Sequence, residues 1–200
     1  MRKGEQFDNE DLLKPYNMLR LYASGAFPMA DENTGEINWY MPDVRTIIPL
    51  DNYNIPRSFK KFLLQTDFNV RFDFNFTAVV KGCAGREKTW ISDRLIEAYN
   101  KLDELGYIHT VETWLDNKLV GGLYGISYKG AFFGESMFSL VPQASKFALA
   151  NLLKHLKDQG FVMLDVQYMT EHLKMFGAKE ISFPEYDLLL RTSYGVDCTF

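Results

Sequence analysis

The sequence YIHTVETWLDNKLVGGLYGISYKGAFFGESMFS, residues 107–139, carries the clearest structural signal in the chain. It contains runs rich in β-branched, aromatic and other apolar residues, at 107–115, 118–128 and 131–138. Tight turns between antiparallel strands favour the kind of residue pair that separates these runs, Asp116-Asn117 and Lys129-Gly130. The segment therefore predicts an antiparallel meander.

Helices and strands alternate on the C-terminal side of the meander. An amphipathic helix is expected at 143–159, a strand at 161–167 and a short helix that ends at Gly177. A strand at 178–182 then leads into a helix for which Ser182 and Glu185 provide a capping box. This order predicts a mixed sheet with helices packed on it, an α+β fold.

The N-terminal side is less regular. A helix is expected over 11–23, loops and strands over 30–55, and an amphipathic helix over 57–65. A strand at 68–74 and a helix capped by Ser92 and closed by Gly106 precede the meander. We therefore place a small N-terminal subdomain at 1–55 and the main domain at 56–200.

Composition excludes several classes of protein. Of the 200 residues, 46% are hydrophobic, which is enough to build a core and excludes global disorder. No apolar run could span a bilayer, and the N-terminus has no apolar segment of a signal peptide, so we expect a cytoplasmic protein. Cys83 and Cys198 lack disulfide or zinc-site spacing and are expected to be free thiols.

The net charge of −4 argues against a protein that coats nucleic acid by charge alone. A local basic face remains open, formed by two groups of residues, Arg57, Lys60 and Lys61 together with Lys81, Arg86, Lys88 and Arg94. The alternative is ordinary solvated surface charge.

Polar residues at strand ends are the candidates for chemistry. Asp165 and Gln167 lie two residues apart and are expected to share one face of a strand. They either form a carboxylate and amide pair in a cleft, or Asp165 satisfies a nearby backbone donor. Glu135 is expected on one face with Phe133 and Met137, where it could hold a cationic amine beside an apolar side chain.

Other kinds of site are excluded by their missing motifs. The histidines His109, His155 and His172 lack the spacing of a metal pair. No serine lies in a nucleophile-elbow motif, and neither a P-loop nor a dinucleotide-binding glycine motif is present.

Several motifs in order along residues 11–190 identify a family resemblance, namely FPM (27–29), WYMPDVR (39–45), TWI (89–91), LVGGLYG (119–125), GESMFS (134–139), ASK (144–146), D-x-Q (165–167) and HL (172–173). The chain resembles the leucyl/phenylalanyl-tRNA–protein transferases. The resemblance implies a GNAT-like acyltransferase domain behind a small N-terminal subdomain. It also implies transfer of Leu or Phe, with Met as a further possibility, from aminoacyl-tRNA to an N-terminal Lys or Arg, which marks the acceptor for N-degron proteolysis.

The resemblance also implies roles for individual residues. Asp165 and Gln167 match the catalytic D-x-Q, in which Gln167 orients the acceptor amine and Asp165 draws off its proton or stabilises its charge. Glu135 holds the polar end of the site. The substrate-binding residues are Leu123, Gly134 and Met137 around the apolar side chain, with Trp90, Tyr40 and Trp39 at the tRNA end.

The implied reaction is aminolysis of an activated ester, so neither a cofactor nor a metal is expected. The expected partners are aminoacyl-tRNA and proteins with N-terminal Lys or Arg, without a membrane, and the expected state is a monomer. Two alternatives stay open. One is a degenerate member that binds aminoacyl-tRNA or N-terminal peptides without turnover, and the other is a GNAT-type acetyltransferase, for which the glycine-rich pyrophosphate turn is missing at 138–146.

Overall fold

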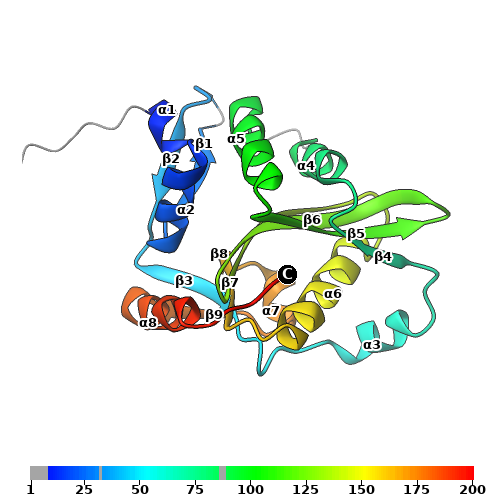
Figure 1. Cartoon of the computed structure of the whole chain (residues 1–200). Helices are drawn as coiled ribbons and strands as arrows, with labels where there is room; N and C mark the ends of the chain where they lie inside the picture. Colours follow the sequence, from blue (N-terminus) through cyan, green and yellow to red (C-terminus); the bar gives the residue numbers. More distant parts are fainter. Residues whose placement is uncertain (1–8, 32, 86–88) are drawn as a thin grey trace, which may run out of the picture.

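The computed structural model describes residues 9–31, 33–85 and 89–200. In these ranges a seven-stranded sheet forms the centre, in the order β4-β5-β6-β7-β8-β3-β9 (Figure 1). Its strands are β3 (Val44–Ile48), β4 (Asn69–Phe72), β5 (Ile108–Leu115), β6 (Lys118–Tyr128), β7 (Ala131–Ser139), β8 (Met163–Gln167) and β9 (Lys179–Ser182). The α+β class and the mixed sheet are confirmed.

The predicted meander is β5, β6 and β7, which pair antiparallel in sequence order. Asp116 and Asn117 both have positive φ, 48° and 60°, as the tight turn between β5 and β6 requires. The neighbouring pairs are antiparallel except β7 with β8, which is parallel. This parallel pair is bridged by α6 (Ala144–Asp158), because parallel neighbours need a crossover connection.

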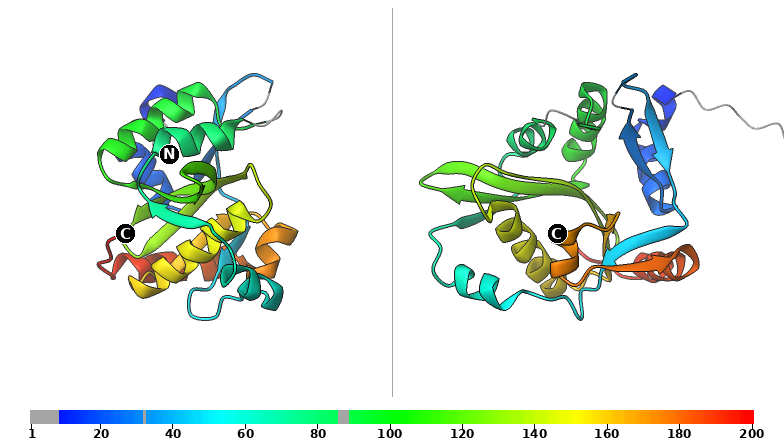
Figure 2. Two further views of the ribbon diagram at one scale, coloured as in Figure 1. Left: turned by 90° about the vertical axis from the view of Figure 1, so that its right-hand side faces the viewer. Right: turned by 180° about the vertical axis from the view of Figure 1, so that it is seen from behind.

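Helices cover both faces of the sheet, as Figures 1 and 2 show. One face carries α4 (Phe76–Ala84) and α5 (Asp93–Glu104), and the other carries α3 (Arg57–Leu63), α6 and α7 (Glu171–Met175). Two clusters of buried apolar residues follow this division, one packed under α4 and α5 and the other under α6. The helix α8 (Phe183–Tyr194) begins at the predicted capping box, where the Ser182 N–H donates to Glu185 Oε2 at 2.9 Å.

The N-terminal segment differs from the single helix predicted over 11–23. It forms α1 (Asn9–Leu12) and α2 (Pro15–Ala23), because Pro15 lacks an N–H to continue a helix and instead begins the second one. A two-stranded sheet of β1 (Phe27–Ala30) and β2 (Ile37–Tyr40) follows. The helix α4 was not predicted either, and its cap is the Asn75 side chain, which accepts from the Ala78 N–H at 3.0 Å.

The small N-terminal segment is present, while its boundary at 55/56 stays a prediction. The strand β3 lies before that boundary and yet pairs with β8 on one side and β9 on the other. A strand from the predicted N-terminal subdomain, β3, is thus part of the central sheet, next to β8.

Gly125 in β6 tests the packing of the meander. A Cβ at this position would lie 2.4 Å from the Phe133 backbone O and 2.3 Å from the Phe132 ring. We expect Gly125→Ala to lower the free energy of unfolding by about 1–3 kcal/mol, since a backbone atom cannot move aside cheaply. Urea denaturation measures the loss. The control is Gly195→Ala, whose Cβ would be no closer than 3.5 Å to Thr192 O, and equal midpoints for the two variants would contradict the packing argument.

Candidate active site

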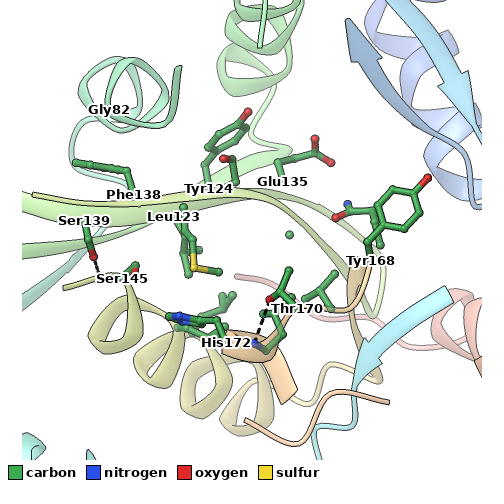
Figure 3. Close-up of a pocket in the computed structure, with 18 of the residues that line it drawn as sticks. Gly82, Leu123, Tyr124, Glu135, Phe138, Ser139, Ser145, Tyr168, Thr170 and His172 are labelled. Carbon is green, nitrogen blue, oxygen red and sulfur yellow. Dashed lines mark hydrogen bonds between the residues drawn. The ribbon is translucent and has the colours of Figure 1, made fainter. Parts of the chain in front are cut away.

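A cavity of about 700 Å³ opens where β7 and β8 separate. The two strands are paired over Ala131–Phe133 and Met163–Asp165, and the residues that follow on both strands line the cavity. In Figure 3 the lining residues lie on both sides of the sheet, with Tyr124 and Glu135 above it and Leu123, Thr170 and His172 between it and the α6 and α7 helices below. The separation of two parallel strands therefore creates the site.

The α6 side of the cavity is apolar. It is lined by Leu123 and Met137 from the sheet and by Leu149 and Leu152 of α6, with Leu164 at the start of the gap. Gly134 also lines the wall, where its missing side chain leaves room beside the Asp165 backbone. Leu123, Gly134 and Met137 were predicted from the sequence to form an apolar pocket, and all three are brought together here.

Glu135 lies at a β-bulge. Tyr124 of β6 pairs with Ser136 and Gly125 pairs with Gly134, so Glu135 is the extra residue in β7. A bulge re-aims side chains and interrupts the alternation of faces. Glu135 and Phe133 consequently lie on the α5 side, whereas Met137 packs with the α6 cluster, so the prediction that all three share a face is wrong.

Two tyrosines hold the Glu135 carboxylate. Tyr22 Oη donates to Oε1 at 3.0 Å and Tyr99 Oη donates to Oε2 at 2.7 Å. Burial raises the pKa of Glu135 to about 7, against the lowering effect of these two hydrogen bonds. Glu135 thus carries a carboxyl that titrates near neutral pH at the cavity wall.

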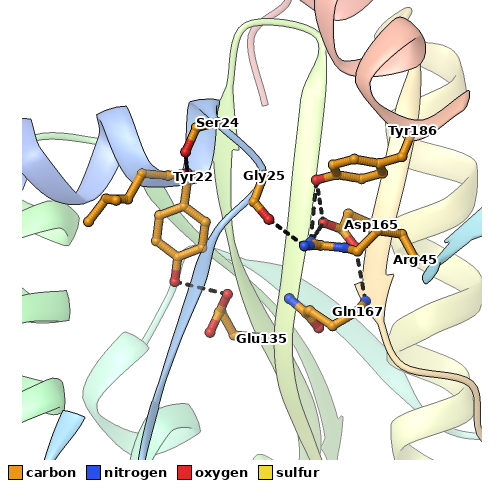
Figure 4. Close-up of polar contacts among 9 residues, drawn as sticks. Tyr22, Ser24, Gly25, Arg45, Glu135, Asp165, Gln167 and Tyr186 are labelled. Carbon is orange, nitrogen blue, oxygen red and sulfur yellow. Dashed lines mark hydrogen bonds and ion pairs between the residues drawn. The ribbon is translucent and has the colours of Figure 1, made fainter. Parts of the chain in front are cut away.

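Asp165 is fully buried and paired. Its Oδ2 accepts from Arg45 Nη2 and, at 2.8 Å, from Tyr186 Oη, while its Oδ1 accepts from the Gln167 backbone N–H at 2.9 Å (Figure 4). Arg45 Nη1 in turn donates to Gly25 O. Gln167 and Glu135 both line the cavity. Asp165 is not among the described residues that line it.

Gln167 has an unusual backbone. Its φ is 57°, and the Tyr168 N–H donates to Val166 O at 2.7 Å, which closes a three-residue turn around it. The pairing of β3 with β8 shifts register here, since Thr46 pairs with Gln167 and Ile47 with Asp165. The Gln167 amide is directed to the side on which Glu135 lies (Figure 4).

The aromatic residues named for the tRNA end occupy different places. Trp90 lines the cavity, together with Phe27 and Met29 of β1. Trp39 packs edge-on against Tyr22, with ring centroids 5.7 Å apart, and Tyr40 stacks on Phe27 at 6.2 Å. The contact predicted for Trp39 and Tyr40 with tRNA stays a prediction.

The basic residues that the structure describes do not form one face. Arg57, Lys60 and Lys61 lie on α3, on the α6 side of the sheet, whereas Lys81 and Arg94 lie on α4 and α5 on the opposite side (Figure 1). Arg94 Nη2 lies 3.6 Å from Glu10 Oε1. Arg86 and Lys88 lie outside the described residues.

One hydrogen-bonded histidine lies away from the cavity. His109 contacts Asp73 Oδ2 at 2.8 Å and Ser127 Oγ at 3.0 Å. These three residues do not make a hydrolytic site. The Ser127 N–H already donates to Tyr107 O, so it cannot stabilise an oxyanion. The Phe200 ring stacks on His109 at 4.2 Å and covers the imidazole. In the ranges that the structure describes, no group of three metal-ligating side chains occurs.

The residues that hold the two carboxylates were not predicted from the sequence, namely Tyr22 and Tyr99 for Glu135, and Arg45 and Tyr186 for Asp165. A buried carboxylate needs charged or hydrogen-bonding partners, which signals that partners exist but not where they lie in the sequence.

No helix in the described part of the chain has the length and apolarity of a membrane span.

The Glu135 carboxyl generates a pH prediction. Its pKa is higher in the folded chain, about 7, than its ordinary 4.5, so folding favours the protonated form and stability is lost as the pH rises through this window. Glu135→Gln removes the titration. Between pH 4.5 and 7.5, wild type should lose up to about 3 kcal/mol of unfolding free energy relative to the variant. Urea denaturation measures this, and parallel pH profiles would contradict it.

Relatives with curated names match most of the chain. A leucyl/phenylalanyl-tRNA–protein transferase of Salinibacter ruber is 46% identical over 177 residues, which cover 88% of this chain and 78% of the relative. Solved structures are more distant. L-PGS from Bacillus licheniformis has a TM-score of 0.49 and 13% identity, covering 76% of this chain and 65% of that one. A conserved protein of Staphylococcus epidermidis has a TM-score of 0.44 and 10% identity, covering 90% and 66%.

Two family models match consecutive parts of the chain. The model of the leucyl/phenylalanyl-tRNA protein transferase N-terminal domain matches residues 11–43, and the model of the leucyl/phenylalanyl-tRNA protein transferase matches residues 47–191. The motifs that line the cavity lie within these matches, and the chain belongs to the leucyl/phenylalanyl-tRNA–protein transferase family.

Proposed function

We propose that the cavity between β7 and β8 is where this aminoacyl-tRNA–protein transferase moves Leu or Phe onto the α-amine of an N-terminal Lys or Arg. The observation that carries the proposal is the composition of its wall. An apolar side formed by Leu123, Met137 and α6 adjoins a polar end formed by Glu135 and Gln167. One cavity thus suits an apolar aminoacyl side chain and a cationic amine together.

The apolar side accommodates the side chain of the transferred amino acid. Leu, Phe and Met differ by only a few apolar groups, and one methylene changes the preference of such a pocket by about 1–3 kcal/mol. The pocket therefore excludes charged side chains more strongly than it separates these three.

The polar end handles the acceptor. An α-amine has a pKa of about 7.7–8.0, so part of it is uncharged at neutral pH. With a pKa of about 7, Glu135 is matched to attract the cationic amine and to accept its proton. As the new C–N bond forms, the ester C–O bond to ribose breaks, and the ribose oxygen takes up the proton that the attacking nitrogen loses. The Gln167 amide orients the attacking amine.

The tRNA would be held at its 3′ end. Trp90 at the cavity wall would stack the terminal adenine, a contact worth about 1–3 kcal/mol. The exposed cations of α3, Arg57, Lys60 and Lys61, would attract its phosphates. The ester is already activated, so the proposal needs neither a cofactor nor a metal. We further propose that the enzyme acts as a monomer in the cytoplasm, where tRNA is charged.

Transfer assays with defined peptides test the function. Leu and Phe, each radiolabelled and charged on tRNA, are incubated with peptides that begin with Arg, Lys, Asp or Ala. We expect transfer to the Arg and Lys peptides alone, because the cavity wall offers a carboxylate to a cation. Transfer to the Asp peptide would contradict the acceptor proposal, and binding of charged tRNA without any transfer would indicate a binding protein.

Gln167→Ala tests the site within the same assay. We expect the single-turnover rate to fall at least tenfold with little change in the dissociation constant of aminoacyl-tRNA, because the amide acts on the attacking amine. The matched control is Gln159→Ala at the exposed end of α6, which should leave both values unchanged. Equal rates for Gln167→Ala and wild type would remove Gln167 from the site.

A further inference from the structure

We propose that Arg45 is a positioning residue for transfer, and that together with Asp165 and Tyr186 it holds Gln167 in the turn that places its amide in the cavity. In this arrangement Asp165 positions Gln167 and does not take the proton of the amine. The proposal rests on the proposed function, because it assigns the residues that keep the polar end of that site in place.

The backbone of Gln167 needs such support. For any residue other than glycine, a left-handed backbone conformation costs of order 1–3 kcal/mol. It persists only where the surrounding structure holds it. At Gln167 the φ is 57° and the flanking Tyr168 N–H and Val166 O are bonded to each other. The Gln167 N–H has the Asp165 carboxylate as its acceptor, at 2.9 Å. This hydrogen bond ties the turn to Asp165.

The Asp165 carboxylate is in turn fixed by its neighbours. Oδ1 accepts from Gln167, and Oδ2 accepts from both Arg45 and Tyr186. Both oxygens are therefore engaged inside the protein. The side chain is fully buried and does not line the cavity, so a substrate amine in the cavity would not reach it.

Arg45 is suited to this task by its surroundings. The guanidinium lies between the rings of Phe27 and Tyr186, with its central carbon 4.9 Å and 4.5 Å from their centroids. It donates to Asp165 on one side and to Gly25 O on the other. A planar group with several fixed donors can make all these contacts at once, which a lysine cannot.

Gly25 anchors the arrangement to the N-terminal segment. Its φ is 88°, and a Cβ there would lie 2.8 Å from the Tyr186 ring. The turn after α2 therefore brings its carbonyl close to Tyr186 and Arg45. The N-terminal segment thus acts on Gln167 through Arg45 and Asp165.

Two readouts test the proposal on the full chain. Tyr186→Phe removes one hydrogen bond to Asp165 and keeps the ring. We expect hydrogen exchange of the Gln167 and Tyr168 amides, measured by NMR, to become about fivefold faster, and single-turnover transfer at saturating aminoacyl-tRNA to slow by a similar factor. The dissociation constant of aminoacyl-tRNA should not change. The control is Thr192→Val on the same helix, which loses a hydrogen bond to Leu188 O.

A double-mutant cycle separates positioning from proton transfer. Asp165→Asn leaves the Arg45 charge buried without its carboxylate, so we expect slow transfer and weakened folding. Adding Arg45→Gln removes that charge, while the amide oxygen introduced at position 165 can still accept from the Gln167 N–H. The double variant should transfer at least tenfold faster than Asp165→Asn alone. A double variant as slow as the single one would overturn the proposal, because a proton acceptor at Asp165 could not be restored in this way.

The exchange measurement also keeps the two proposals apart. If wild type transfers nothing, the proposed function fails, while the exchange of the Gln167 and Tyr168 amides still reports whether Tyr186 and Asp165 hold the turn. Unchanged exchange in Tyr186→Phe, or equal acceleration in Thr192→Val, would overturn the positioning role whatever the transfer rate.

Discussion

The buried ion pair of Arg45 and Asp165 is the contact on which the architecture of the site depends. It joins β3 to β8, and through Tyr186 and Gly25 O it adds α8 and the turn after α2. Two charges removed from water are costly to separate, because either alone would be left uncompensated. The pair therefore fixes the end of β8, where the Gln167 backbone leaves the regular strand.

The site combines two irregular strands. A bulge in β7 turns Glu135 toward Tyr22 and Tyr99, and a register shift between β3 and β8 accompanies the turn at Gln167. Both irregularities occur just beyond the last residues through which β7 and β8 pair with each other, where the cavity opens. The short segment 22–25 contacts both arrangements, through Tyr22 and through Gly25 O. The N-terminal segment is thus part of the candidate site.

Local sequence signals predicted much of this molecule. The turn pairs at 116–117 and 129–130 specified the meander, and the Ser92 and Ser182 caps marked α5 and α8. The family resemblance also named Leu123, Glu135 and Gln167, and all three line the cavity. The partners Arg45 and Tyr186 could not be, because they lie 120 and 21 residues from Asp165 and meet it only after the sheet assembles. The bulge at Glu135 was missed for a similar reason, since strict alternation assumes an unbroken register.

A crystal structure with a non-hydrolysable phenylalanyl-adenosine amide would test the central claim, that Gln167 and Glu135 meet the substrate while Asp165 holds Gln167 in place. We predict the phenyl ring beside Leu123 and Met137, the adenine on Trp90, and Gln167 within hydrogen-bond distance of the acyl group or its nitrogen. Asp165 should keep its contacts with Arg45 and the Gln167 N–H. An Asp165 carboxylate released from Arg45 and bonded to the analogue would contradict the account.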